Sequence, residues 1–171
     1  VCITERPQIV ETRSRIGDWE ADTVIGRQGG AVLVTLVERK SRFSLIIRAE
    51  NKTATAVSVA MTTAMSPHAA HVHTLTYDNG KEFAYHLKVS DELEAKGFFA
   101  HPYHSWERGL NENTNGLIRQ YLPKGESFDD LTDQDVVDIM DRLNNRPRKC
   151  LGFRTPNEVF RKDKSDVALA S

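Results

Sequence analysis

The sequence has little of what several classes of protein require. It contains two cysteines, 10 glycines and 6 prolines in 171 residues, and its best apolar run, Ala31–Val37, is interrupted by Thr35. A membrane helix needs about 20 apolar residues in succession, so this run excludes a span. Cys2 and Cys150 lie near opposite ends without a partner motif, which is typical of thiols in a reducing compartment.

No charged and then apolar segment of the secretory type opens the chain, so we expect a cytoplasmic protein with no membrane attachment. Because the first residue is Val1 and not Met, we also expect a piece of a longer protein. The composition, 39% hydrophobic and 27% charged, is that of a folded globular domain.

The net charge of −1 does not by itself indicate a nucleic-acid partner, but the charges are unevenly distributed. Residues 125–141 hold seven acids and no base, a pattern typical of a solvated face. Residues 142–154 hold five bases and no acid, together with Asn144 and Asn145. This basic block fits a solvated face and a phosphate-binding surface equally well.

Alternation of apolar and polar residues predicts a strand at residues 19–25, and a β-branched run predicts another at 31–37. With a third strand at 43–47, they are joined by short turns into an antiparallel meander. Helical spacing then predicts a helix over 54–65, followed by a strand at 73–77, a helix over 81–96 and a short strand at 98–100. Two more helices follow. One carries Leu110–Tyr121, and the other starts at Thr132, buries Val136, Val137, Ile139, Met140 and Leu143, and stops before Pro147. This order predicts one α/β domain with a mixed five-stranded sheet, namely the meander plus two parallel strands, flanked by helices.

Two carboxylates occupy unusual places in this scheme. Asp22 lies inside the first strand and Asp78 ends the fourth, and each alone is explained by an exposed strand face or a turn. If the first strand is central, however, the two side chains lie on neighbouring strands at a similar height, where a divalent cation relieves their repulsion.

A third acid, Glu112, lies on the helix after Gly109 and points away from its apolar face, together with Asn115 and Arg119. That face supplies a metal ligand and two donors to phosphate, although a solvated helix surface explains it equally well. The six histidines do not show zinc-ligand spacing, and the sequence has neither a G-x-S-x-G elbow nor a glycine-rich phosphate loop.

Several motifs stand in order along the chain: Gly17–Asp18–Trp19–Glu20–Ala21–Asp22, Tyr77–Asp78–Asn79–Gly80–Lys81–Glu82–Phe83, Pro102–Tyr103–His104–Ser105–Trp106–Glu107–Arg108–Gly109-x-Asn111–Glu112–Asn113 with Asn115, Asn145–Arg146–Pro147–Arg148, and Leu151–Gly152-x-x-Thr155–Pro156-x-Glu158-x-Phe160. Together they resemble the catalytic core that retroviral integrases share with bacterial insertion-sequence transposases. The detail around Trp19 and Trp106 is similar to the insertion-sequence thirty family.

This resemblance implies a ribonuclease-H-like fold and a DDE transposase that cuts DNA and transfers strands at insertion-sequence ends. It makes Asp22, Asp78 and Glu112 the catalytic acids, holding two Mg²⁺ or Mn²⁺ ions. We expect Asn79, Glu82 and Glu107 to support them, and we expect Asn115, Arg119, Arg146, Arg148 and Lys149 to contact DNA.

The resemblance further implies that residues 17–160 form the core, that 1–16 form an extension or linker and 161–171 a tail, and that the enzyme is a homo-oligomer on DNA in the bacterial cytoplasm. Two alternatives remain: a ribonuclease-H-type nuclease, and a non-catalytic DNA-binding protein derived from a transposase.

Overall fold

The computed structural model describes residues 1–102, 104, 107 and 109–168, with side chains as far as Lys162. Four residues of the third motif, Tyr103, Ser105, Trp106 and Arg108, lie outside this range. The strands are β1 Asp18–Ile25, β2 Val32–Glu38, β3 Ser44–Ala49, β4 Thr74–Tyr77 and β5 Lys96–Phe99. The α-helices are α1 Gln8–Thr12, α2 Ala54–Met65, α3 His86–Leu93, α4 Gly109–Ile118, α5 Asp133–Asn144 and α6 Pro156–Ala168.

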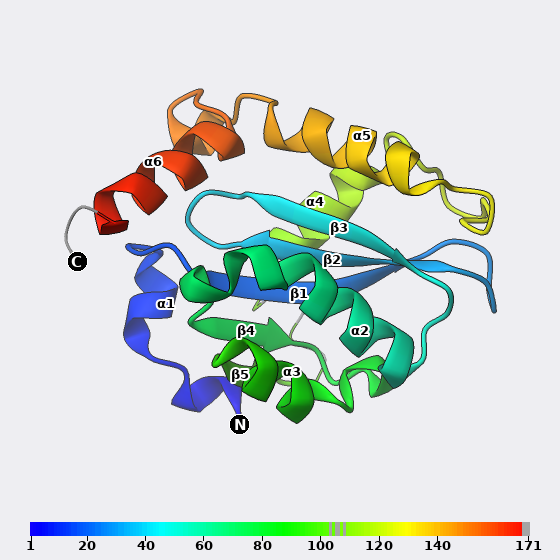
Figure 1. The fold of residues 1–171 in the computed structure, drawn as a ribbon, viewed down its shortest axis with the longest axis horizontal. Coiled ribbons are helices and arrows are strands. Elements are labelled where there is room, and N and C mark those ends of the chain that lie inside the picture. The colour runs from blue at the N-terminus through cyan, green and yellow to red at the C-terminus, as the bar shows by residue number, and fades with distance from the viewer. Residues whose placement is uncertain (103, 105–106, 108, 169–171) are drawn as a thin grey trace.

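The five strands form one sheet in the order β3-β2-β1-β4-β5 (Figure 1). β1, β2 and β3 pair antiparallel, whereas β4 pairs parallel with both β1 and β5. The predicted fold class, a mixed sheet made of a meander and two parallel strands, is therefore confirmed. The first strand is central, as the prediction for Asp22 and Asp78 requires.

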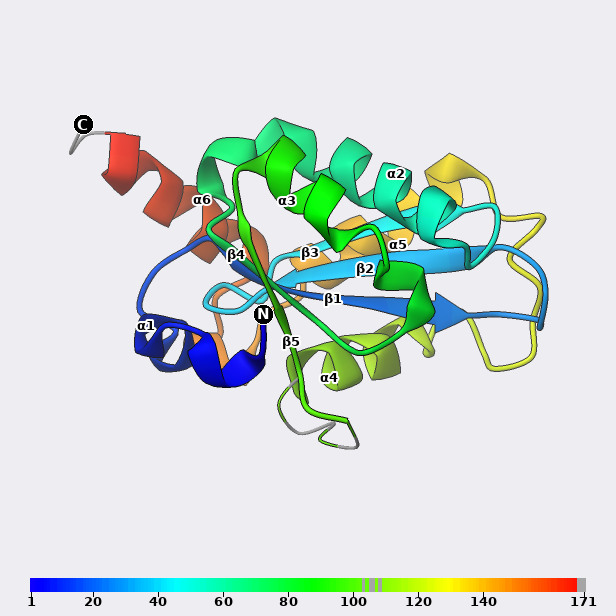
Figure 2. The ribbon, with the colours of Figure 1, turned by 90° about the horizontal axis from the view of Figure 1, so that it is seen from below.

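The helices cover both faces of the sheet. Seen along its edge, the sheet has α2 and α3 on one side and α4 on the other (Figure 2). Trp19, Ala21 and Leu75 pack into the core under α2 and α3, while Val24 joins Ile118 of α4 in a second cluster. Since successive side chains of a strand point to opposite faces, Asp18, Glu20 and Asp22 lie on the face that α4 covers.

The helix predicted over residues 81–96 is wrong in its extent. The chain forms a 3₁₀ turn at Lys81–Phe83, and α3 ends at Leu93 because Glu94 adopts a left-handed conformation with φ of 51°. Lys96 already belongs to β5, where Gly97 pairs with Leu75. A Cβ on Gly97 would stand 3.1 Å from the Tyr77 ring, so this glycine permits close strand packing and does not end a helix.

Other details of the prediction also change. Val137 is 38% exposed, because only one stripe of α5 can face the sheet, and this stripe carries Val136, Ile139 and Leu143. The capping box predicted at Thr132 and Asp135 is present.

Two helices were not predicted from the sequence. α1 is only five residues long, but its Val10 is fully buried. α6 brings Phe160 against Phe43, with stacked rings 4.3 Å apart. The start of α6 is marked by Thr155 and Glu158, which bond to each other's backbone amides as a capping box does. No helix within the described residues is long and apolar enough to span a membrane.

Glu38 ends β2 as a fully buried carboxylate without a basic partner among the described residues. It accepts hydrogen bonds from the backbone N–H and hydroxyl of Ser41, both at 2.6 Å, and from the Gly17 N–H at 3.2 Å. Burial raises the pKa of Glu38, and these hydrogen bonds oppose the shift without cancelling it.

We therefore expect Glu38 to make the protein less stable as the pH rises. A raised folded-state pKa means that the folded protein binds this proton more tightly than the unfolded chain does. The associated stability is complete below about pH 4.3, the unfolded value, and is lost as the pH passes the folded pKa. Glu38→Gln should flatten the fall in the free energy of unfolding above about pH 4.3, measured by urea titration. The matched control is exposed Glu92→Gln. If the free energy of unfolding of Glu38→Gln fell with pH as steeply as that of the wild type, Glu38 would not be the group responsible.

Candidate active site

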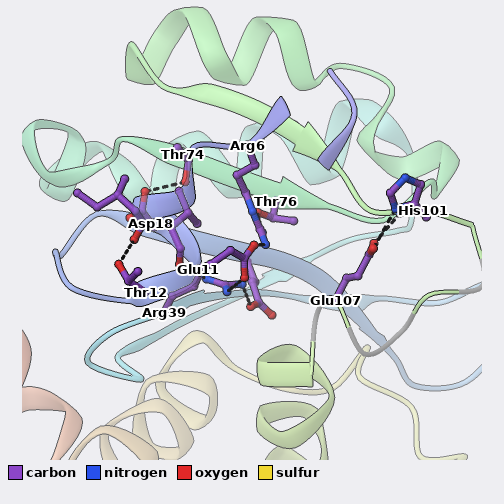
Figure 3. Close-up of polar contacts among 12 residues, drawn as sticks. Arg6, Glu11, Thr12, Asp18, Arg39, Thr74, Thr76, His101 and Glu107 are labelled. Carbon is purple, nitrogen blue, oxygen red and sulfur yellow. Dashed lines mark hydrogen bonds and ion pairs between the residues drawn. The ribbon is translucent and has the colours of Figure 1, made fainter. Parts of the chain in front are cut away.

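A row of three carboxylates runs along the α4-facing side of β1, and each carboxylate has its own partners. Asp18 is 1% exposed and accepts two hydrogen bonds from Arg15, both at 2.9 Å. It accepts a third from the Thr74 hydroxyl at 2.8 Å (Figure 3). Glu20 and Asp22 follow at two-residue steps and contact α4. β1 thus presents one acid after another toward the same helix.

Glu20 ties the start of α4 to the sheet. Its carboxylate is 1% exposed and accepts from Arg39 Nη1 at 2.6 Å and from the backbone N–H of Asn111 at 3.2 Å. Asn111 lies in the first turn of α4, where free N–H groups and the helix dipole favour an anion. Burial raises the pKa of Glu20 while the Arg39 charge lowers it, and burial dominates. Glu20 therefore acts as a capping group supplied by a strand.

Arg39 is itself held in a wider network. It donates to the Val10 carbonyl at 3.2 Å and pairs with Glu11, which also pairs with Arg6. Arg6 donates to the hydroxyl of Thr76 on β4 at 2.8 Å (Figure 3). The segment before β1 is thereby joined to β1, β4 and the end of β2.

Asp22 is bound to the second turn of α4. Asn115 Nδ2 donates to Asp22 Oδ2 at 2.9 Å, and Asn115 Oδ1 accepts from the Thr35 hydroxyl at 3.3 Å. Thr35 lies opposite Asp22 on β2. The other Asp22 oxygen accepts from the Thr23 N–H at 2.8 Å. Because Glu112 precedes Asn115 by three residues, it shares the helix face that meets Asp22, and its side chain is exposed.

Asp78 stands where β4 ends, on the strand beside Asp22. Glu20 pairs with Thr76, and two further residues along each strand lead to Asp22 and Asp78. Their side chains have the same parity and face the same side of the sheet. Asp78 Oδ1 accepts from the Gly80 N–H at 2.8 Å, which fixes the turn after the strand. The predicted placement of the two acids on neighbouring strands is therefore confirmed.

Glu82 reaches the same end of the sheet from the other face. It is 5% exposed, and its Oε1 accepts from the Thr23 hydroxyl at 3.1 Å and pairs with Lys52 at 2.8 Å. A Cβ on Gly80 would collide with the carboxylates of both Glu82 and Asp78. These two acids are therefore close neighbours around Gly80, and a side chain at this position would displace their carboxylates.

Glu107 and Asn79 make different contacts. Glu107 accepts from the backbone N–H of His101 at 2.8 Å and bonds to its ring at 2.9 Å (Figure 3). Partial burial raises the pKa of Glu107, but the bonds to His101 outweigh burial, so the pKa of Glu107 is lowered. The hydrogen bond to the Glu107 carboxylate in turn raises the pKa of His101. Asn79 Nδ2 donates to the Ala100 carbonyl at 2.7 Å and so ties the turn after β4 to the chain after β5.

The residues expected to contact DNA occupy several environments. Arg119 donates to the Ile25 carbonyl at 2.6 Å and lies over the Phe128 ring, so it connects the end of β1 to the loop before α5. Arg146 is exposed and donates to Gln120 at 3.1 Å, Arg148 donates to the Leu143 carbonyl at 3.0 Å, and Lys149 is exposed.

Sequence reasoning did not single out Glu20, Arg39 or Asn111 for the site. A signal for Glu20 was available, because a charge two residues before Asp22 on a central strand has to be buried on the same face.

Asp22, Asp78 and Glu112 offer only carboxylate oxygens, the ligands that Mg²⁺ prefers. They come from two adjacent strands and from the helix that Asn115 holds against Asp22. Within the part of the chain that is described, no three His, Cys, Asp or Glu side chains stand close enough to hold a metal ion. Carboxylates without a cation between them repel, so the chemistry of this donor set nevertheless suits a divalent cation.

Comparison with known proteins gives consistent results. The chain is 47% identical over 173 residues to the transposase for insertion sequence element IS4351 of Bacteroides fragilis, covering 100% of this chain and 53% of that protein. It is 40% identical over 159 residues to transposase InsI for insertion sequence element IS30A of Escherichia coli K12, covering 92% of this chain and 41% of that protein. The chain spans about half the length of these relatives. No family model matches it.

Among solved structures, the HTLV-2 integrase catalytic core domain in complex with magnesium, in a trimeric form, superposes with a TM-score of 0.64. The match covers 85% of this chain and 97% of that chain at 18% sequence identity. At this identity the match establishes the fold alone, and the expected ribonuclease-H-like fold is confirmed.

The contacts of Glu20 predict that Arg39→Met is strongly destabilising. Removing one partner of a buried ion pair leaves an uncompensated charge, which costs about 3–5 kcal/mol. Urea unfolding should show this loss, whereas Lys88→Met, which breaks the exposed pair with Glu92, should cost less than about 1 kcal/mol. Arg39→Met with Glu20→Met should recover part of the loss. An Arg39→Met variant as stable as Lys88→Met would show that Glu20 does not depend on this pair.

Proposed function

We propose that this chain, which is homologous to insertion-sequence transposases of the IS30 type, is the catalytic domain of a DDE transposase. Its activity is metal-dependent cleavage of DNA and strand transfer at the ends of an insertion sequence. The observation that carries the proposal is the bond from Asn115 to Asp22. It holds the helix face of Glu112 against β1, next to the strand that delivers Asp78.

In this proposal Asp22, Asp78 and Glu112 hold two divalent cations, Mg²⁺ or Mn²⁺. When bound, such ions activate an attacking oxygen and stabilise the leaving oxygen of a DNA phosphate. The carboxylate oxygens of these residues fit that requirement, and a magnesium complex exists for the HTLV-2 integrase core.

The remaining residues of the site position these three acids. Asn115 fixes the orientation of the Asp22 carboxylate and Gly80 that of Asp78, while Glu20 holds the first turn of α4. Such preorganisation keeps ligands rigid without cost at the moment of reaction. Asn79 and Glu82 support the turn after β4, and Glu107 supports the segment before α4.

The nucleophile in this reaction is water for hydrolysis at the transposon end and a DNA 3′-hydroxyl for strand transfer. Arg146, Arg148 and Lys149, together with Asn115 and Arg119, are the proposed contacts to DNA. Residues 17–160 form the catalytic core, and the enzyme works as a homo-oligomer on DNA in the bacterial cytoplasm.

Metal binding is testable without catalysis. A ligand that binds only the folded form stabilises it, so Mg²⁺ or Mn²⁺ should raise the Tm of the wild type. Asp22→Asn removes a ligand and should abolish most of this shift. Glu92→Asn on α3 is the matched control and should shift as the wild type does. Equal shifts in Asp22→Asn and the wild type would place the metal elsewhere.

The chemistry is testable with a pre-cut oligonucleotide and a target plasmid. We expect Glu112→Gln to fold normally but to lose about 10³-fold or more in cleavage and joining, as the loss of several kcal/mol of transition-state stabilisation requires. Glu82→Gln and Glu107→Gln should lose less, about ten- to a hundred-fold.

The same assay, run beside a parallel reaction on an RNA–DNA hybrid, separates the alternatives. A ribonuclease-H-type nuclease would cut an RNA–DNA hybrid without joining DNA ends, and a non-catalytic protein would do neither. An inactive Glu107→Gln beside an active Glu112→Gln would assign the third acid to Glu107.

A further inference from the structure

Three arginines from distant parts of the sequence line one cavity beside α4. The cavity has a volume of about 300 Å³ and is bounded by Arg13 after α1, Arg42 between β2 and β3, and Arg148 after α5. Its remaining wall comes mainly from the first turns of α4, through Gly109, Leu110, Asn113 and Thr114, with Cys150 beside Arg148. None of the described residues that line it is acidic.

These arginines differ from the other arginines around the site. Arg6 and Arg39 both pair with Glu11, and Arg15 pairs with Asp18. Among the residues that the structure describes, no carboxylate pairs with Arg13, Arg42 or Arg148. Three like charges that converge on one cavity repel each other, and an anion between them removes that repulsion.

Arg148, which lines the cavity, also has a hydrogen-bond donor that lacks an acceptor. Arg148 Nε is buried without a partner within the described chain, although Arg148 Nη2 donates to the Leu143 carbonyl. Partial burial lowers the pKa of Arg13, and the charge of Arg42 lowers it further against the opposing effect of Glu20 and Glu11. Partial burial also lowers the pKa of Arg148, with smaller contributions from the charges of Arg146 and Arg42. The guanidinium groups stay charged, so the cavity retains a concentrated positive field.

The backbone at two of these positions is strained. Arg13 has φ of 51° and Arg42 has φ of 63°, and they are two of the four non-glycine residues with positive φ among those described. Glycine adopts this conformation without a steric penalty, whereas arginine does not. Arg13 is the left-handed residue that ends α1, and Arg42 lies in the turn between β2 and β3, so the two turns of the chain bring both arginines to the cavity.

The position of the cavity indicates the source of the anion. Asn113 and Thr114, which line it, lie on α4 between Glu112 and Asn115, which face the candidate active site. One DNA strand carries a phosphate about every 3.4 Å along the duplex axis, and a turn of α-helix rises about 5.4 Å. A DNA strand that has one phosphate at Glu112 and runs along α4 toward Gly109 would bring its next phosphates to the cavity that Asn113 and Gly109 line.

We propose that Arg13, Arg42 and Arg148 bind a backbone phosphate of the DNA strand that crosses α4, a proposal that rests on the function proposed above. Guanidinium groups bind phosphate oxygens in a bidentate fashion, and three of them around one cavity fix the position of the strand. Asn113 and Thr114 offer further hydrogen bonds to the same group. The contact is independent of base sequence.

The test is equilibrium binding of a short DNA duplex in EDTA, followed by fluorescence anisotropy over a range of salt concentrations. Arg13→Gln with Arg42→Gln should weaken binding about tenfold and flatten the log–log salt slope by about 0.9 for each phosphate that the variant no longer neutralises. Lys88→Gln with Arg161→Gln removes the same charge elsewhere and should stay near the wild type. A double arginine variant that binds like this control overturns the proposal.

A second variant separates binding from folding. Arg13→Gly with Arg42→Gly relieves the positive φ values, so its Tm should equal or exceed that of the wild type by a few degrees while DNA binding falls as in the glutamine variant. A lower Tm with unchanged DNA binding would assign the arginines to the fold and overturn the proposal.

Inorganic phosphate distinguishes the two sources of the anion. If it raises the Tm of the wild type but not that of Arg13→Gln with Arg42→Gln, and DNA binding is the same in both, the cavity takes a free anion and the DNA assignment is wrong. Because these measurements need no metal or catalysis, they do not depend on the strand-transfer result. A wild type that binds DNA through these arginines but fails to join ends would overturn the proposed function alone.

Discussion

The arrangement of this domain depends on one buried carboxylate, Glu20 at the centre of β1. A carboxylate cannot be buried unless its charge and hydrogen-bonding capacity are satisfied. Glu20 meets this requirement with Arg39 on one oxygen and the N–H of Asn111 on the other. The bond between Glu20 and Asn111 therefore joins β1 to α4, two residues before Asp22 on the strand and one residue before Glu112 on the helix.

Much of the sheet could be predicted from the sequence, because its determinants are local. Alternation in residues 19–25 and the β-branched run of 31–37 mark two strands, and a crossover through α2 can return β4 beside β1, as it does. The end of α3 could not be predicted in this way. It depends on the left-handed Glu94 and on the pairing of Lys96 with Thr74, a long-range contact that no helical periodicity contains.

For the candidate site, too, some features could be predicted from the sequence and others could not. The motifs identified Asp22, Asp78 and Glu112, and strand adjacency gave a physical reason for the first two. The partners of these acids could not be read from the sequence. A carboxylate in a strand can bond to any donor that the fold brings near, and Asn115 reaches Asp22 from α4, as Arg39 reaches the neighbouring Glu20 from the turn after β2. Arg119 shows that a shared helix face does not fix what a side chain contacts. It lies on the face of Glu112, but its guanidinium donates to the backbone carbonyl of Ile25.

A chain with a net charge of −1 can still bind a polyanion, because the field at a surface depends on where the charges lie. Asp18, Glu20 and Glu38 are buried and satisfied, so they contribute little to the potential outside. The acidic block lies largely on α5, which packs against β3 at the edge of the sheet. The α4 side of β1 and the loops after α1, β2 and α5 are left with arginines and few exposed acids. For a polyanionic partner, the separation of acids from bases in the fold is therefore a better guide than the net charge.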